Sequence, residues 1–332
     1  AGNSTMMHLA AGIPPKNIAA APFIPASLEM MRISAAEMGI SIADQGSIYL
    51  LPGISAYIGA DITAATLASG MANEEPLSLL IDIGTNGEIM LGNKDRLLSC
   101  STAAGPAFEG ATIHDGGGGI AGAINTVSLH DSSLSFTTIA DGKPIGICGS
   151  GIVDTLSNLL YAGIIDETGR MVGDGDIESE AGKELAKNLT KFDDQTAYSL
   201  APSSATAHGD AILLTQKDVR EVQNAKASIA AGITTLIKTS GKSVNDIERV
   251  FLAGGFGSYI DKHHAIHIGL IPKELENKIE VIGNAAGSGA IMALLSRDKF
   301  QECSSLSEKT EYIELSSSPE FMDDYVNSMM FS

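Results

Sequence analysis

The chain has 332 residues, 44% of them hydrophobic, with 36 glycines and a formal net charge of −19 at pH 7. This length suggests about two domains at the usual ~150 residues each, and the composition is typical of a packed, loop-rich α/β protein. The negative charge argues against nucleic acid or anionic membranes as partners and leaves a basic protein or a metal–nucleotide complex open. A need for solubility is the simpler explanation of the charge.

Three cysteines, Cys100, Cys148 and Cys303, are far apart in the sequence. Without a Cys-x-x-Cys pair, they predict neither a zinc site nor a four-cysteine iron–sulfur cluster within the chain. We interpret Cys148 as a small buried thiol rather than a redox group, because no cation flanks it. The few cysteines and the lack of a signal peptide or a ~20-residue apolar span predict a cytoplasmic protein. The start without Met suggests a fragment or a processed chain.

The N-terminal part predicts few regular elements. A helix begins near residue 4, capped by Asn3 or Ser4, and a strand over 48–51 follows a proline-rich loop. A helix of small residues over 56–71 is expected to pack closely on a neighbour. A turn at 73–76 then marks a boundary, which divides the chain into residues 1–76 and 77–332.

The stretch 79–91 is the most informative in the chain. Two apolar runs flank a polar turn, and Asn86–Gly87 favours a type I′ hairpin, because that turn needs positive φ at both central residues. We expect Gly84 and Gly87 to leave backbone N–H groups free, while Thr85 and Asn86 add side-chain partners. A concave loop of amides of this kind suits a phosphate. An ordinary hairpin is the alternative interpretation.

Two acidic residues flank this turn. Asp82 ends the first strand, where it would hold a hydrated Mg²⁺ through water; an inward Asp without a ligand is the alternative. Glu88 begins the second strand and faces either the cleft or solvent, and both interpretations stay open.

Beyond the hairpin, the apolar pattern predicts strands at 97–100, 133–139, 250–252 and 278–282, and helices at 151–162, 215–241 and 283–296. The helix at 215–241 is the clearest, because Thr215 and Asp218 resemble a capping box before one apolar stripe. Residues 166–210 are polar and are expected to form an insertion of low regularity. The glycine-rich run 115–122 predicts the most flexible loop.

Three features follow one another in a familiar order: the hairpin with Asp-Ile-Gly-Thr-Asn-Gly, a later strand followed by Gly-Gly-Phe-Gly at 254–257, and a Gly/Ala-rich helix after the next strand. This order resembles the acetate kinase, sugar kinase, Hsp70 and actin superfamily. The resemblance implies an α/β fold in which two ribonuclease-H-like lobes close over ATP. Each lobe supplies a phosphate hairpin, and a glycine pair in the second lobe admits the adenosine.

Longer strings make the resemblance more specific. They are Leu-Ile-Asp-Ile-Gly-Thr-Asn-Gly-Glu at 80–88, Ser-Thr-Ala-Ala-Gly-Pro-Ala-Phe-Glu-Gly-Ala at 101–111, Gly-Ile-Cys-Gly-Ser-Gly at 146–151, Thr-Gln-Lys-Asp-Val-Arg-Glu-Val-Gln at 215–223, Leu-Ala-Gly-Gly-Phe-Gly-Ser-Tyr at 252–259 and Pro-Glu-Phe-Met-Asp at 319–323. Together they are similar to the C-terminal ATPase region of reductive activators of corrinoid proteins. These activators use ATP to return cob(II)alamin to cob(I)alamin.

The resemblance implies ATP and Mg²⁺ as cofactors, a corrinoid protein or corrinoid methyltransferase as partner, and a homodimer. The residues it places at the phosphates and Mg²⁺ are Asp82, Gly84, Thr85, Asn86, Gly87 and Glu88, with Asp82 nearest the metal. Those it places at the adenosine are Gly254, Gly255, Phe256 and Gly257. It assigns no catalytic side chain, since water would attack the phosphate.

The chain departs from the family pattern in three ways. It holds no iron–sulfur module, which we expect upstream or in a separate module. It holds one Asp-Ile-Gly-Thr hairpin, which resembles that of the second lobe, so we expect that lobe complete over 77–332, a truncated first lobe over 1–76, and an incomplete nucleotide site. A segment Ile113-His114-Asp115 with four glycines replaces a Cys-Gly-Met-like segment. We expect no electron transfer by this chain alone.

Two other functions fit the same residues: a small-molecule kinase of the superfamily, and a non-catalytic docking or dimerisation module. Three histidines at 263, 264 and 267 have spacings that suit a metal, but an exposed helix start explains them more simply. Arg220 and Lys226 would meet phosphate or, as we expect, pair at the surface with Glu221 or Glu248. Gly105 and Glu109 lie in a family-like string without an assigned role.

Overall fold

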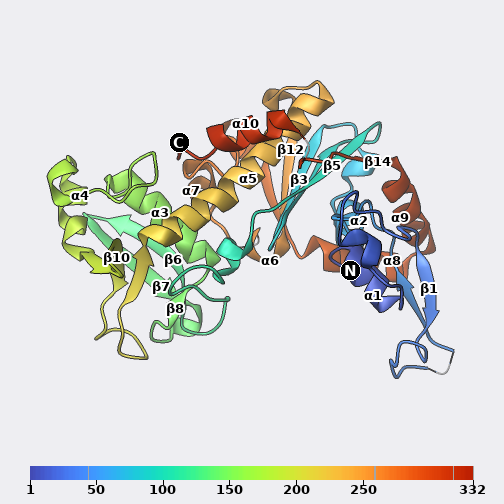
Figure 1. The fold of residues 1–332 in the computed structure, drawn as a ribbon, viewed down its shortest axis with the longest axis horizontal. Helices are drawn as coiled ribbons and strands as arrows, with labels where there is room; N and C mark the ends of the chain where they lie inside the picture. Colours follow the sequence, from blue (N-terminus) through green and yellow to red (C-terminus); the bar gives the residue numbers. More distant parts are fainter. Residues whose placement is uncertain (44, 258, 317, 332) are drawn as a thin grey trace.

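The computed structural model describes residues 1–43, 45–257, 259–316 and 318–331. Its centre is a six-stranded sheet in the order β13-β12-β3-β4-β5-β14, with helices on both faces (Figure 1). The strands are β3 (Ser78–Ile83), β4 (Gly87–Gly92), β5 (Leu97–Thr102), β12 (Arg249–Ala253), β13 (Ile279–Gly283) and β14 (Thr310–Tyr312).

The strand directions identify the type of sheet. β3, β4 and β5 form an antiparallel meander, while β12 runs parallel to β3 and β13 runs parallel to β12. This mixed arrangement is that of the ribonuclease-H-like lobe that the sequence predicted. Because β3 and β12 are parallel neighbours, their carboxyl ends reach the same edge of the sheet.

The two faces of β3 are covered by different helices, because successive side chains of a strand point to opposite sides. Leu79, Ile81 and Ile83 lie in one core cluster with α5 (Gln216–Ser240), whereas Leu80 lies in the other with α2 (Ala60–Ser69) and α8 (Ala285–Leu295). Asp82 shares the second face with Leu80. The acidic end of the hairpin therefore points towards the α2 side of the sheet.

Small residues let these helices approach closely. A Cβ added to Gly289 in α8 would lie 1.8 Å from the carbonyl oxygen of Ala64 in α2. On the other face, a Cβ on Gly232 of α5 would lie 2.5 Å from Thr102 Cγ2. The helix of small residues is thus a close-packing element, as the sequence predicted. It begins at Ala60 rather than at residue 56.

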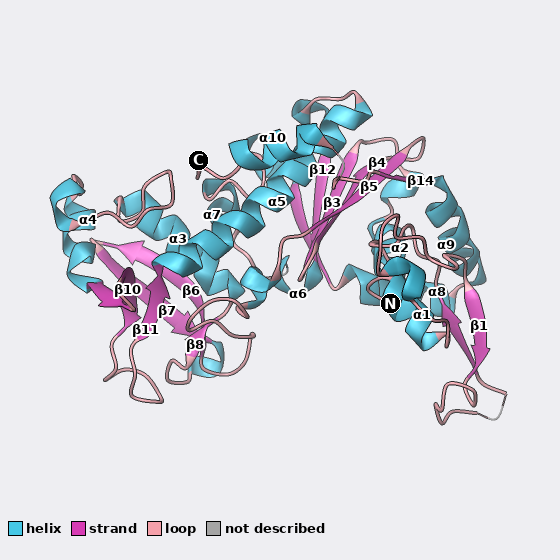
Figure 2. Cartoon of the chain, viewed as in Figure 1, coloured by secondary structure: helices cyan, strands magenta, loops and turns pink. Residues whose placement is uncertain are grey.

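A second body with two three-stranded sheets lies beside the central sheet (Figure 2). Its elements are β6 (Ala123–His130), β7 (Ser133–Thr138), β8 (Gly146–Ile147), α3 (Gly149–Ala162), α4 (Glu180–Leu185), β9 (Leu189–Phe192), β10 (Gln195–Ala201), β11 (Ile212–Thr215) and α7 (Lys262–His267). The segment 166–210 is therefore more regular than the sequence suggested. Its strands are short, and in β10 the buried residues come in adjacent pairs, Ala197 with Tyr198 and Leu200 with Ala201, so the alternation that marks a half-buried strand is missing.

The other α-helices and strands lie outside the central sheet and the second body. They are α1 (Ser4–Ala10), β1 (Met31–Ser34), β2 (Ser47–Leu50), α6 (Gly254–Gly257), α9 (Arg297–Lys309) and α10 (Pro319–Asn327). Asn3, not Ser4, caps α1, since its side chain accepts a hydrogen bond from the Met6 amide. The capping box of Thr215 and Asp218 is confirmed. No helix in the described part of the chain has the length and apolar content needed to cross a membrane.

Candidate nucleotide site at the end of the central sheet

The loop 84–86 joins β3 to β4, as the sequence predicted, but it is not a type I′ turn. Neither Asn86 nor Gly87 has a positive φ, because Gly87 is the first residue of β4 rather than part of the turn. A glycine is needed there for packing: an added Cβ would lie 2.7 Å from Ile229 Cγ1 and from Thr102 Oγ1. The Asn-Gly pair thus predicted the position of the turn correctly, but the turn type that it predicted is wrong.

The loop offers a small set of hydrogen-bond donors. The Gly84 amide donates to the carbonyl of Asn86 at 3.0 Å, so the prediction that this amide is free is wrong. The amides of Thr85 and Asn86 have no acceptor among the residues that the structure describes. The Thr85 hydroxyl donates to the carboxylate of Glu109, whose oxygens lie 3.0 and 2.9 Å away. Two free amides beside a hydroxyl form a donor set that suits a small anion.

Two carboxylates lie at the base of this loop. Asp82 and Glu88 are register partners across β3 and β4. Glu88 is only 6% exposed, so its interpretation as a surface carboxylate is wrong. Burial, and then the charges of Asp61 and Asp82, raise the pKa of Glu88 to about 8. Burial and the charge of Asp61 raise the pKa of Asp82 to about 6.

Asp61 is the residue of this site that the sequence analysis missed. It lies in the first turn of α2, and burial raises its pKa. Its charge acts on both Asp82 and Glu88, so the N-terminal part of the chain contributes to the same acidic site. One signal was available: Asp61 is the single charged residue in the stretch 56–71.

The glycine segment that follows β12 lies directly against the acidic end of β3. Ala253 pairs with Asp82, which brings α6 to the hairpin. Gly254 has a φ of +93°, and a Cβ there would lie 2.5 Å from Asp82 Oδ1 and 2.7 Å from the Ile83 carbonyl oxygen. Only glycine combines this conformation with so close an approach. The two halves of the predicted site, far apart in sequence, therefore adjoin in space.

The other residues of α6 differ in their surroundings. A Cβ on Gly255 would meet open space, whereas one on Gly257 would lie 3.2 Å from Leu252 Cγ. The ring of Phe256 stacks on Phe108 with centroids 4.8 Å apart and planes 16° from parallel. Phe256 thus fixes the wall beside the glycines, and Gly255 is the position that leaves room for a ligand.

The carboxylate oxygens at this site suit Mg²⁺ only as partners of its bound waters. Mg²⁺ prefers carboxylate oxygens and keeps several of its waters, and Asp61, Asp82 and Glu88 supply such oxygens. Among the described residues, no three His, Cys, Asp or Glu side chains lie close enough to hold one metal ion directly. A hydrated ion brought by a nucleotide matches this arrangement better than a permanent metal centre.

The three histidines lie in α7, a short helix that begins at Lys262, so the predicted helix start is confirmed, but only His263 is exposed. His264 Nδ1 lies 2.7 Å from Ser157 Oγ, and burial lowers the pKa of His264. His267 Nδ1 lies 2.8 Å from the same oxygen, while His263 is exposed. The sequence analysis missed this contact because Ser157 lies in another helix, more than a hundred residues away.

The remaining candidates are structural. Cys148 is buried, as interpreted. The expected surface pairing of Lys226 is wrong: this side chain is 1% exposed, burial lowers its pKa to about 8, and it donates to the carbonyl of Met330. Arg220 donates to the Thr168 carbonyl and the Gln223 side chain instead of pairing with a carboxylate.

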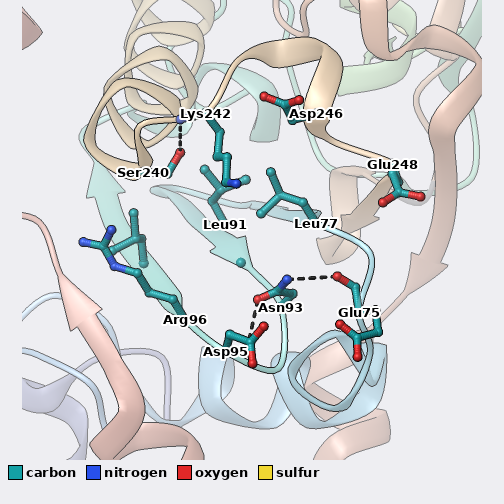
Figure 3. A pocket seen from close by; sticks show the side chains of 12 residues that line it. Glu75, Leu77, Leu91, Asn93, Asp95, Arg96, Ser240, Lys242, Asp246 and Glu248 are labelled. Carbon is teal, nitrogen blue, oxygen red and sulfur yellow. Dashed lines mark hydrogen bonds between the residues drawn. The ribbon is translucent and has the colours of Figure 1, made fainter.

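A pocket of about 420 Å³ lies at the opposite end of the sheet, where β4 ends and β5 begins (Figure 3). Arg96 and Lys242 line it together with Glu75, Asp95 and Asp246. Because both signs of charge are mixed there and the hairpin loop is at the other end of the strands, this pocket is not part of the candidate site.

Comparisons with known proteins agree on a family. Residues 76–332 match the model described as the C-terminal domain of RACo, the ASKHA domain, and residues 1–74 match the RACo middle region. The corrinoid activation enzyme RamQ of Eubacterium limosum is 36% identical over 332 residues, which covers 99% of this chain and 55% of that protein. The [Co(II) methylated amine-specific corrinoid protein] reductase of Methanosarcina barkeri is 28% identical over 308 residues, which covers 86% of this chain and 51% of that protein.

A solved structure gives the same result. The reductive activator for a corrinoid, iron–sulfur protein superimposes with a TM-score of 0.90 at 38% identity, over 100% of this chain and 52% of that one. The chain thus spans about half the length of the relatives it matches. An ASKHA domain implies ATP binding, and the sheet topology agrees with this actin- and Hsp70-like fold. The chain belongs to the family of RACo, in which it comprises the middle region and the C-terminal ASKHA domain.

Proposed function

We propose that this chain is the ATP-binding and partner-docking part of a reductive activator of corrinoid proteins. Its relatives carry that activity in their names, and they match it over nearly its whole length. The observation that carries the proposal is the contact of Gly254 with Asp82. This contact places the glycine segment 254–257 next to the hairpin that carries the loop 84–86, which we call the phosphate loop. A nucleotide that spans both segments would require them to be adjacent.

Each part of the site has a proposed task. The free amides of Thr85 and Asn86 bind a phosphate, and the open side of Gly255 admits the adenosine. Asp61, Asp82 and Glu88 hold the waters of Mg²⁺, which would neutralise phosphate charge when bound. The positive ion in turn relieves the repulsion among these three carboxylates. Binding of Mg·ATP would therefore be linked to their deprotonation.

Hydrolysis needs no protein nucleophile in this scheme. Water attacks the γ-phosphorus, the bond to the β-phosphate oxygen breaks, and ADP leaves. The protein supplies position and charge neutralisation. We propose that ATP binding or hydrolysis draws the elements around the site into another arrangement, which assists the transfer of one electron to cob(II)alamin.

The electron would come from an iron–sulfur group outside these 332 residues. The three cysteines are buried, and among the described residues no three His, Cys, Asp or Glu side chains lie close enough to hold one metal ion. A corrinoid protein or corrinoid methyltransferase would be the partner, and a homodimer the working assembly. These expectations rest on the family resemblance.

Calorimetric titration with Mg·ATP and Mg·ADP tests the central step. We expect saturable binding of one nucleotide per chain, which Gly255→Leu abolishes by filling the open position, while Gly173→Leu, at an open position in the other body, leaves it unchanged. Heat of binding that is absent at millimolar nucleotide would favour a purely docking module. ATP-dependent phosphorylation of a small substrate in the absence of a corrinoid protein would instead favour a kinase.

A further inference from the structure

Glu109 contacts the phosphate loop but has no task in the scheme above. It is the last residue of a 3₁₀ helix, Pro106–Glu109, and its side chain is exposed. Both carboxylate oxygens lie within hydrogen-bond distance of Thr85 Oγ1, at 3.0 and 2.9 Å. Oε1 also lies 3.9 Å from the point that a Cβ of Gly84 would occupy. The Glu109 carboxylate thus already contacts the loop that is proposed to bind a phosphate.

The backbone that carries Glu109 is held on both sides. Gly105 and Gly110 flank the short helix with φ values of +73° and +79°, and a Cβ on Gly110 would lie 2.3 Å from the Gly117 amide nitrogen. Within the helix, Phe108 stacks on Phe256 of the glycine segment. The backbone is therefore fixed relative to both halves of the site, whereas the exposed carboxylate is free to turn away.

We propose that the Glu109 carboxylate holds the Thr85 hydroxyl beside the free amides of Thr85 and Asn86 in the nucleotide-free chain, and is displaced when a nucleotide phosphate binds to the loop 84–86. This inference rests on the proposed function. The Thr85 hydroxyl has an acceptor in both states, first the carboxylate and then the phosphate. Glu109 is in this sense a residue that sets specificity: it prevents weak anions from occupying the loop.

The size of the effect follows from the geometry. The displaced carboxylate stays within about 10 Å of the bound phosphate, because the backbone that carries it is held on both sides. At an effective dielectric constant of about 20, the repulsion between two charges at this distance corresponds to about a five- to twenty-fold change in affinity. A ligand without a phosphate meets no such repulsion, so its affinity should not depend on the charge of Glu109.

The test compares Glu109→Gln with the unmodified chain in titrations with Mg·ADP and with adenosine. Glu178→Gln is the matched control, because it removes an equally exposed charge in the other body of the chain. We expect Glu109→Gln to bind Mg·ADP about five- to twenty-fold more tightly, with adenosine affinity unchanged and no change in Glu178→Gln. In a Thr85→Val background, the gain from Glu109→Gln should shrink to less than about three-fold, because no hydroxyl is left for which the two anions compete.

The outcomes separate this inference from the proposed function. Equal or weaker Mg·ADP binding by Glu109→Gln, in a chain that does bind, overturns the inference and leaves the nucleotide site intact. A parallel change for adenosine also overturns it, since that pattern indicates a structural effect. If neither the unmodified chain nor Glu109→Gln binds Mg·ADP, both proposals fail together.

Discussion

The buried carboxylate Glu88 makes the stability of the chain depend on pH in a defined direction. Its pKa is raised from an ordinary 4.5 to about 8 in the folded chain. Between these values the folded chain binds a proton that the unfolded chain does not. The free energy of unfolding therefore falls as pH rises through this interval, and the contribution is fully present only below about pH 4.5.

The substitution Glu88→Gln removes this titration and keeps the shape of the side chain. At 1.36 kcal/mol for each pH unit, the difference in unfolding free energy between Glu88→Gln and the unmodified chain should grow by about 2–4 kcal/mol from pH 5 to pH 8 in favour of the variant. Urea denaturation at a series of pH values measures it. Glu29→Gln, at an exposed position, is the control.

Each of the two variants lacks one carboxylate of a protein with net charge −19, so Glu29→Gln accounts for the general repulsion that the loss of one charge relieves. Mg·ADP should reduce the pH dependence of the unmodified chain, because the cation favours the ionised carboxylates. Parallel pH curves for Glu88→Gln and the unmodified chain would refute the reasoning. They would mean that Glu88 is not buried beside other negative charges.

Three further predictions concern packing and the buried lysine. Gly254→Ala should lower the unfolding free energy by about 1–3 kcal/mol, because of its positive φ and the contact with Asp82, whereas Gly255→Ala should change it by less than about 0.5 kcal/mol in urea denaturation without ligand. Gly289→Ala should cost about 2–3 kcal/mol, since its Cβ would meet the α2 backbone, and a thermal midpoint equal to that of the parent chain would contradict the close packing of α2 on α8. The pKa of Lys226 is lowered from its ordinary 10.5 to about 8, so between these pH values the unfolded chain binds a proton that the folded chain does not. Relative to Lys226→Met, the free energy of unfolding of the parent chain should therefore rise by about 2–3 kcal/mol between pH 8 and 10.5. A difference in unfolding free energy that stays constant over this range would argue against burial of the ammonium group.

Local patterns in the sequence located most of the frame. The apolar runs on either side of residues 84–86 predicted β3 and β4, and the Thr215–Asp218 capping box predicted the start of α5. These features depend on neighbours within a few residues, so the sequence displays them directly. The glycine segment at 254 was placed by resemblance, and the structure supplies the reason for its glycine.

Other parts of the site depend on distant contacts and were not readable. Asp61 acts on Glu88 only because α2 packs over the face of the sheet to which Leu80 and Asp82 point. The glycine at 87 is required by α5 rather than by the turn, which is why the turn type was predicted wrongly. The contact of Glu109 with Thr85 likewise depends on how the 3₁₀ helix folds back over the loop.

Hydrogen–deuterium exchange with and without Mg·ADP tests the central claim most directly. The account predicts slower exchange in peptides that contain 82–88 and in peptides that contain 253–257. The protection of both segments should reach half of its maximum at the same nucleotide concentration, while exchange in 189–201 of the second body stays unchanged. Protection of only one of the two segments, or of neither at a nucleotide concentration that saturates binding, would contradict a single nucleotide site between them.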